Sequence, residues 1–290
     1  MNYRHAYHAG NFADVLKHAI LARVVSHLKL KATPFRIIDT HAGTGRYDLE
    51  SVAAGKTGEW TAGIGRLMSA SPPAATALML EPYLRAVRDL NPDGALKFYP
   101  GSPLLARMLM RRDDQLVANE LHAEDYEALK SEFHKVRDTK VLNLDAWTAI
   151  KSLLPPRERR GAVLIDPPFE QSDEFERVAG AMEQALVRFS NGTFIIWYPL
   201  KNERAANRFI SRMQEAGTAK ALDARLWIDA PGALPGLTAT GILVINPPFR
   251  LREDLEIILP FLVSILAQGL GASHRLSGWG DGWPGAALPH

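Results

Sequence analysis

The chain has 290 residues, 47% of them hydrophobic, and a net charge of +2, which is enough apolar material for one large domain with an inserted piece or for two modest domains. It contains no cysteine, which excludes disulfide bonds and thiolate metal sites and fits a reducing cytoplasm. The N-terminus lacks an apolar signal-peptide core, and the late apolar run IILPFLVSIL is too short to cross a bilayer, so neither export nor membrane insertion is expected.

The N-terminal region is basic and is expected to contain a helix. Before Ile37, six Lys and Arg residues stand against a single acid, Asp14. Asn11 followed by Asp14 forms a variant capping box, and apolar residues then recur near helical spacing, which predicts an amphipathic helix over residues 12–30. A second basic cluster, RERR, lies at 157–160. Such clusters are typical either of solvated surfaces or of contacts with nucleic acid, and their positions relative to the active site decide between the two.

Beyond the first helix, short apolar runs alternate with helical segments. Seven such runs end at Thr40, Leu121, Asp145, Asp166, Pro199, Asp229 and Asn246. Several are too continuously apolar for a half-exposed sheet, so helices should cover both faces. The pattern predicts an α/β fold with a doubly wound, seven-stranded, mostly parallel sheet. The last two runs are joined by APGALPGL without a helix, which predicts an antiparallel pair at the edge of the sheet, with an antiparallel last strand.

Two segments depart from this alternation. Residues 46–100 separate the first strand from the helix expected at Ser102; they look mainly helical and are too long for an ordinary loop, so we expect an inserted helical subdomain. The main domain is then residues 1–45 and 101–268. Residues 269–290 are rich in Gly and Pro, which predicts a flexible tail.

A glycine turn follows the first predicted strand in DTHAGTGRYD, where Gly43 and Gly45 come after Asp39. A dinucleotide fingerprint would need a third glycine at position 48, where Asp48 stands. The turn therefore matches the shorter acid-x-x-x-Gly-x-Gly pattern that holds S-adenosylmethionine, with a purely structural glycine turn as the alternative.

Acids also end the next two predicted strands, at Glu120 and Asp145. Because the carboxyl ends of neighbouring strands line one crevice, both side chains should face the same ligand as Asp39. Glu120 can accept hydrogen bonds from ribose hydroxyls, and Asp145 can accept one from an adenine amine. Helix capping is the alternative role for either acid alone.

The motif DPPF follows the fourth run and has a near copy, NPPF, late in the chain. Asp166 and the carbonyl of Pro167 can accept hydrogen bonds from an exocyclic amine as its nitrogen gains positive charge, and Phe169 offers a ring for an extruded base to stack on. Asn246 follows an antiparallel strand whose carboxyl end must point to the opposite rim. We therefore assign catalysis to Asp166–Phe169 and a structural role to Asn246–Phe249.

Five segments in this order, YRHAYHAGNFADVLKH, DTHAGTGRYDL, YPGSP, NELH and IDPPFE, closely resemble the bacterial ribosomal large subunit methyltransferase J family of 23S rRNA adenine-N6 methyltransferases. The resemblance runs from Tyr3 to about residue 265. It implies a class I, Rossmann-like methyltransferase fold with a small helical insertion. It also implies S-adenosylmethionine as the donor and in-line methyl transfer to the N6 amine of one flipped-out adenosine in 23S rRNA.

Carried over position by position, the resemblance adds site residues to those above. The resulting cofactor contacts are Lys17, His18, Asp39, His41, Gly43, Ser102, Glu120, Asp145, Ala146 and Asp166. The expected RNA contacts are Tyr3, Arg4, His5 and Lys17, because cations near the substrate entrance would meet phosphates. Two positions depart from the family pattern: Phe169 stands where many members have tyrosine, and Ala146 where glycine is common.

Three alternatives stay open at this point: a DNA adenine-N6 methyltransferase, a non-catalytic RNA-binding protein on a methyltransferase scaffold, and a nicotinamide oxidoreductase, against which the missing third glycine counts. The expected partner is 23S rRNA, free or in early assembly, with no membrane and, for want of metal-ligand spacing, no metal. No oligomeric state is assigned, and a monomer is slightly favoured.

Overall fold

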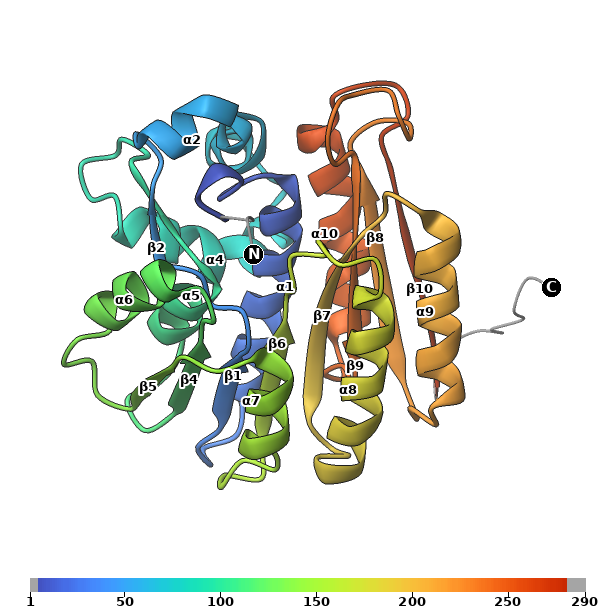
Figure 1. Cartoon of the computed structure of the whole chain (residues 1–290). Coiled ribbons are helices and arrows are strands. Elements are labelled where there is room, and N and C mark those ends of the chain that lie inside the picture. Colours follow the sequence, from blue (N-terminus) through green and yellow to red (C-terminus); the bar gives the residue numbers. More distant parts are fainter. Residues whose placement is uncertain (1–4, 281–290) are drawn as a thin grey trace.

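The computed structural model describes residues 5–280 (Figure 1); Tyr3, Arg4 and the last part of the predicted tail lie outside this range. Within it the strands of the main sheet run, in spatial order, β5 (Thr139–Leu142), β4 (Gln115–Asn119), β1 (Arg36–Asp39), β6 (Gly161–Ile165), β7 (Thr193–Pro199), β9 (Ala239–Ile245), β8 (Ala221–Trp227) and β10 (Ser273–Trp279). The first five are parallel, and β9 is antiparallel to both β7 and β8. The predicted class I methyltransferase fold is confirmed.

The predictions for the end of the chain were partly wrong. Residues 273–279, assigned to a flexible tail, form β10, which pairs antiparallel with β8 and makes an eighth strand in the described residues. The last two predicted strands do form an antiparallel pair, β8 and β9, but β10 takes the edge of the sheet beside β8, and β9 lies between β7 and β8. Composition missed β10 because edge pairing uses backbone groups, and most of its side chains stay exposed or half-buried.

Helices cover both faces of the sheet (Figure 1). One face carries α1 (Phe12–Leu28), α4 (Ala74–Asp89), α5 (Ser102–Leu109), α6 (Ala123–Glu132) and α10 (Leu251–Leu266). The other face carries α7 (Ala146–Leu153), α8 (Glu174–Arg188) and α9 (Glu203–Glu215). Each set forms its own hydrophobic cluster with the sheet side chains that alternate toward it. No helix in residues 5–280 is long and apolar enough to cross a membrane.

Helix α1 begins as predicted but is not amphipathic. The side chain of Asn11 accepts hydrogen bonds from the backbone N–H of Ala13 (3.0 Å) and Asp14 (3.1 Å), which confirms the predicted cap. The helix contacts α4, α5 and α10 as well as β9, so nearly all of its side chains are buried. Lys17 and His18 are therefore enclosed in the protein, and the predicted solvent-facing stripe does not exist.

The inserted segment contains the predicted helices and a short ribbon that was not predicted. Strand β2 (Arg46–Asp48) pairs antiparallel with β3 (Phe98–Pro100), and α2 (Val52–Thr57), a π-helical turn (Thr61–Gly65), α3 (Arg66–Ser69) and α4 lie between them. Ile64 and Tyr83 are fully buried in the same cluster as α1. The division of the chain into a main domain and an inserted subdomain stays a prediction, and the insertion shares its core with the rest of the protein.

Candidate active site

A cavity of about 990 Å³ opens at the carboxyl ends of the parallel strands and beneath the N-terminal segment. It adjoins β1 and β6, where the chain order of the strands reverses and where α/β sheets bind ligands. Predicted site residues from distant parts of the chain meet here. Those that line the cavity are His5, Lys17, His41, Gly43, Ser102, Glu120, Asp145, Ala146, Asp166, Pro167 and Phe169.

Two predicted cofactor residues, His18 and Asp39, lie behind the cavity wall. The Nδ1 atom of His18 is 2.7 Å from the Tyr99 hydroxyl, and burial lowers the pKa of His18 to about 3, so the ring is neutral at pH 7. Asp39 accepts a hydrogen bond from Ser102 Oγ at 2.6 Å and one from the backbone N–H of His41 at 3.2 Å. Asp39 therefore supports Ser102 and His41, which line the cavity, whereas His18 contacts Tyr99, which does not. The predicted cofactor contacts of His18 and Asp39 stay predictions.

Burial also raises the pKa of Asp39, to about 7; the nearby Asp166 carboxylate adds to this rise, and the hydrogen bond from Ser102 opposes it. A carboxyl with such a pKa is part protonated near neutral pH. Asp39 contacts Ser102 and the backbone of His41, which both line the cavity, so a change in the protonation of Asp39 alters hydrogen bonds to the cavity wall.

The strand-end acids both cap backbone groups and line the cavity. Glu120 accepts from the backbone N–H of Gly43 and of His122, each at 2.8 Å, and burial raises the pKa of Glu120. Asp145 caps α7 by accepting from the N–H of Thr148 at 3.0 Å. Helix capping and a position on the cavity lining therefore coexist in Asp145, whereas Glu120 caps no helix and holds the glycine turn through Gly43.

Gly43 is held in a conformation that other residues rarely adopt. Its φ is +60°, and a Cβ atom there would lie 2.0 Å from the hydroxyl of Tyr47. Glycine is thus required at this point of the turn, which brings the backbone up to the cavity.

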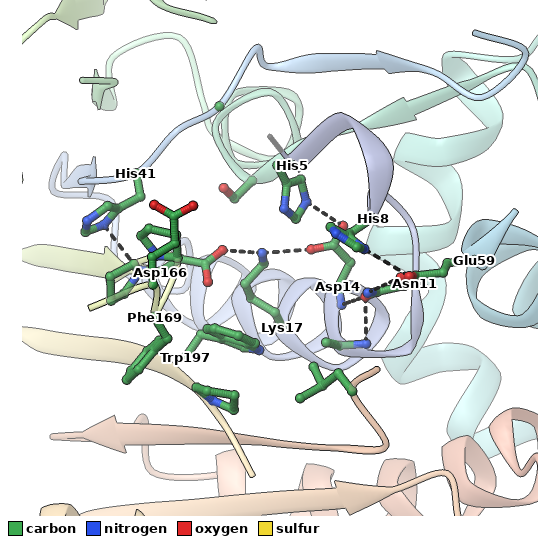
Figure 2. Close-up of a pocket in the computed structure, with 18 of the residues that line it drawn as sticks. His5, His8, Asn11, Asp14, Lys17, His41, Glu59, Asp166, Phe169 and Trp197 are labelled. Atoms are coloured by element: carbon green, nitrogen blue, oxygen red, sulfur yellow. Dashed lines mark hydrogen bonds and ion pairs between the residues drawn. The ribbon is translucent and has the colours of Figure 1, made fainter. Parts of the chain in front are cut away.

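An ion pair joins α1 to the DPPF motif at the centre of the cavity (Figure 2). Lys17 Nζ lies 2.5 Å from Asp166 Oδ2 and 2.8 Å from Asp14 Oδ1. Although burial opposes it, the charges of Asp14 and Asp166 hold the pKa of Lys17 well above its ordinary value, so the ammonium stays charged. Sequence reasoning named Lys17 and Asp166 separately and missed the pair.

Asp14 extends this pair into a buried network that sequence reasoning also missed. Its Oδ2 atom lies 2.9 Å from His5 Nε2 and accepts from the backbone N–H of Gly10 at 2.8 Å. Although burial opposes it, the charges of His5 and Lys17 hold the pKa of Asp14 well below its usual range. Asp14 is the single acid in the basic N-terminal region, and this feature of the sequence could have identified it as a partner of the nearby cations. The sequence analysis assigned it only to a helix cap.

Aromatic rings form one wall next to Asp166. Phe169, with φ of +50°, contacts Phe175 and Trp197 at ring-centroid distances of 4.8 and 5.6 Å. Trp197 comes from β7 and lines the cavity (Figure 2). In the sequence, Trp197 was assigned only to a buried strand. Its place near the carboxyl end of a parallel strand, where the cavity lies, was the feature that could have identified it as a site residue.

His41 sits between this wall and the glycine turn. Its Nδ1 atom lies 3.3 Å from the backbone N–H of Asp166 and 2.8 Å from Thr40 Oγ1. Burial lowers the pKa of His41 to about 4. A neutral ring can accept the hydrogen bond from the Asp166 backbone, which ties the start of the DPPF turn to the end of β1.

The second PPF motif lies on the opposite rim of the sheet, as expected from the antiparallel direction of β9. The register pairs Phe194 at the start of β7 with Ile245 at the end of β9. The side chain of Asn246 donates to the carbonyls of Ser190 (2.8 Å) and Gly192 (2.9 Å), and Phe249 is 85% exposed. These hydrogen bonds stabilise the turn that precedes β7, and none of them involves a residue that lines the cavity.

The cavity lining is acidic. Among the residues that the structure describes, eight carboxylates and three Lys or Arg side chains line it. No group of three or more His, Asp and Glu side chains in residues 5–280 is arranged to hold a metal ion. The lining therefore favours a cationic or neutral ligand over a phosphate.

Comparisons with known proteins agree along most of the chain. The family model "Ribosomal RNA large subunit methyltransferase D, RlmJ" matches residues 32–279. The chain is 40% identical to the ribosomal RNA large subunit methyltransferase J of Escherichia coli K12, over 96% of this chain and 98% of that protein. It is also 40% identical to the protein of the same name from Haemophilus influenzae, over 94% and 96%. The crystal structure of protein LPL1258 from Legionella pneumophila is 30% identical, with a TM-score of 0.85, and covers 93% of this chain and 98% of that one.

Proposed function

The chain belongs to the ribosomal RNA large subunit methyltransferase J family, and from this premise we propose that it methylates the exocyclic N6 amine of one adenosine in 23S rRNA, with S-adenosylmethionine as donor. The observation that carries the proposal is the position of Asp166. Its carboxylate stands at the switch point of the sheet, is fixed by Lys17 and is flanked by Phe169 and Trp197.

The residues that line the cavity fit S-adenosylmethionine. Glu120 and Asp145 can accept hydrogen bonds from ribose hydroxyls and from an adenine amine, and the turn at Gly43 brings backbone groups close. The excess of carboxylates stabilises a sulfonium cation, and it would repel the pyrophosphate of a nicotinamide dinucleotide. When bound, S-adenosylmethionine supplies a methyl group that is already activated for transfer.

Asp166 and Pro167 act on the amine that receives the methyl group. The lone pair of an adenine amine is delocalised into the ring, so the nitrogen must become tetrahedral and gains positive charge. Lys17 holds Oδ2 of Asp166, which leaves Oδ1 for one amine hydrogen, and the carbonyl of Pro167 can accept the other. Two acceptors fixed before the reaction stabilise the developing charge without reorganising.

The aromatic wall can hold the target base outside its helix. Phe169 and Trp197 present apolar ring surface beside Asp166, and stacking of this kind contributes about 1–3 kcal/mol per base. Phe169 preserves the stacking surface of the tyrosine that is common in the family and lacks its hydroxyl. We assign His5, with Tyr3 and Arg4 outside the described residues, to the entrance that the RNA approaches. Lys17 was predicted to contact the RNA as well, but its side chain is 4% exposed and paired with Asp14 and Asp166, so we assign it to the positioning of Asp166 instead. We place this reaction in the cytoplasm.

Transfer of labelled methyl from S-adenosylmethionine to unmodified 23S rRNA, with duplex DNA as competitor, tests the proposal. We expect N6-methyladenosine in the RNA and a loss of about 10²–10³-fold in rate for Asp166→Asn. Asn246→Ala is the matched control, because it alters the corresponding position of the second PPF motif on the opposite rim. Label in DNA would support the DNA methyltransferase alternative, and cofactor binding without transfer would support the non-catalytic one.

A further inference from the structure

The rim of the sheet opposite the cavity carries a concentration of positive charge. Strands β6, β1, β4 and β5 are adjacent and parallel, so the segments that precede them lie side by side at the lower end of the sheet in Figure 1. These segments, residues 29–36, 111–114, 135–140 and 157–160, are called the basic rim here. They hold eleven Lys and Arg residues against four acids, whereas the whole chain has a net charge of +2.

Two cations of the basic rim are held in place by contacts with the segment that precedes β1. Arg111 and Arg160 each donate to the carbonyl of Thr33, at 3.1 and 2.7 Å, and each guanidinium lies 5.6 Å from the ring centroid of Phe35. Burial lowers the pKa of Arg160, and the neighbouring charge of Arg111 adds to the effect. The charge of Asp114 opposes this lowering, so the two guanidinium groups are held in place side by side, an arrangement that suits an anionic partner.

Three of the four acids of the basic rim are engaged: Asp138 accepts a hydrogen bond from Gln115 Nε2 at 3.0 Å, and the other two form ion pairs. Asp114 is buried against Arg111, and Glu158 pairs with Arg36 at 2.9 Å. Within the part of the chain that the structure describes, the exposed side chains of Lys31, Arg112 and Arg157 form no salt bridge. The remaining positive charge therefore faces solvent.

We propose that the basic rim binds the phosphodiester backbone of a part of the substrate rRNA that lies away from the target adenosine. This inference rests on the proposed function. The acidic cavity suits a neutral base and a cationic donor and repels phosphates, so affinity for the RNA backbone must come from other surfaces. Lys and Arg contacts to phosphates supply such affinity without reading sequence.

The distance between the two sites suits a single large RNA. Six residues of chain that include β6 lead from Arg160 to Asp166, which spans about 20 Å at about 3.3 Å per residue. A folded rRNA segment extends well beyond this length, so one molecule can present a base to the cavity and phosphates to the basic rim.

A triple variant, Lys31→Gln, Arg112→Gln and Arg157→Gln, tests the inference. The matched control, Arg85→Gln, Lys130→Gln and Arg208→Gln, removes the same charge from exposed positions on α4, α6 and α9. The probe is an unmodified full-length 23S rRNA transcript, with affinity measured by filter binding over a range of salt concentrations.

We expect the basic-rim variant to bind at least about tenfold more weakly near physiological salt, with the slope of log affinity against log salt reduced by about two to three. The control should keep wild-type affinity, and both variants should keep the wild-type single-turnover rate at saturating RNA. Equal losses in both variants, or no loss in the first, would overturn the inference. A loss of binding to anionic phospholipid vesicles with rRNA binding intact would overturn it in favour of a membrane surface. Wild-type protein that binds rRNA without methylating it would refute the proposed function alone.

Discussion

Replacing Lys17 by methionine removes the ammonium between Asp14 and Asp166 while keeping most of the side-chain volume. The Lys17 side chain is 4% exposed, and its Nζ atom lies 2.8 and 2.5 Å from the two carboxylates. Removal of one partner of a buried ion pair costs about 3–5 kcal/mol, because a charge is left buried without compensation. We expect the free energy of unfolding of Lys17→Met to fall by this amount, a large part of the 5–15 kcal/mol typical of a protein domain.

Urea denaturation of four proteins measures this effect: wild type, Lys17→Met, Asp166→Asn and the double variant. Asp166→Asn should lose less stability than Lys17→Met, since Lys17 keeps its contact with Asp14. Adding Asp166→Asn to Lys17→Met should restore part of the lost stability, because it removes a carboxylate that has no counter-charge. A Lys17→Met protein within about 1 kcal/mol of wild type, or strictly additive effects, would refute the reasoning.

Three further predictions follow from single positions. Gly43→Ala should weaken S-adenosylmethionine binding by about tenfold in calorimetric titration, because the new Cβ would meet the Tyr47 hydroxyl at a positive φ. Burial raises the pKa of Asp39 to about 7, so the stability that its protonation contributes is fully present below about pH 4 and is lost as the pH rises through about 7. In urea melts across this window, Asp39→Asn should flatten the decline in the free energy of unfolding, by up to about 4 kcal/mol. Trp197→Ala should lower kcat/KM for RNA by about tenfold with cofactor affinity unchanged, whereas Phe249→Ala, at an 85% exposed ring, should change neither.

Local chemistry and strand direction were sufficient to place several features. The cap at Asn11 follows from one side chain and two neighbouring N–H groups, so it was visible in the sequence. The opposite placement of Asp166 and Asn246 followed from counting helical connections, because a strand that returns without a helix must run antiparallel. The first inference uses only neighbouring residues, and the second uses only the segment that connects two consecutive strands.

The network around Lys17 could not be predicted in the same way. Lys17 and Asp166 are 149 residues apart in the chain, and their contact depends on how α1 packs across the sheet. A lysine in a helix is ordinarily exposed, and it is buried only when a partner compensates its charge. Because that partner was unknown, the periodicity of the helix was interpreted as amphipathic, although α1 is enclosed on nearly every side.

The small net charge gave little indication of a nucleic-acid partner, because it sums two opposite surfaces. The cavity lining has more carboxylates than Lys and Arg side chains within the described residues, and the basic rim has the reverse. Phosphates bind to positively charged surfaces and a cationic donor binds to negatively charged ones, so a single surface could not bind both. In the function proposed above, the separation of charge along the strands lets the basic rim attract the RNA backbone while the cavity at the other end accepts an uncharged base beside a sulfonium. For a protein of this kind, the distribution of charge over the sheet therefore carries more information about the substrate than its total.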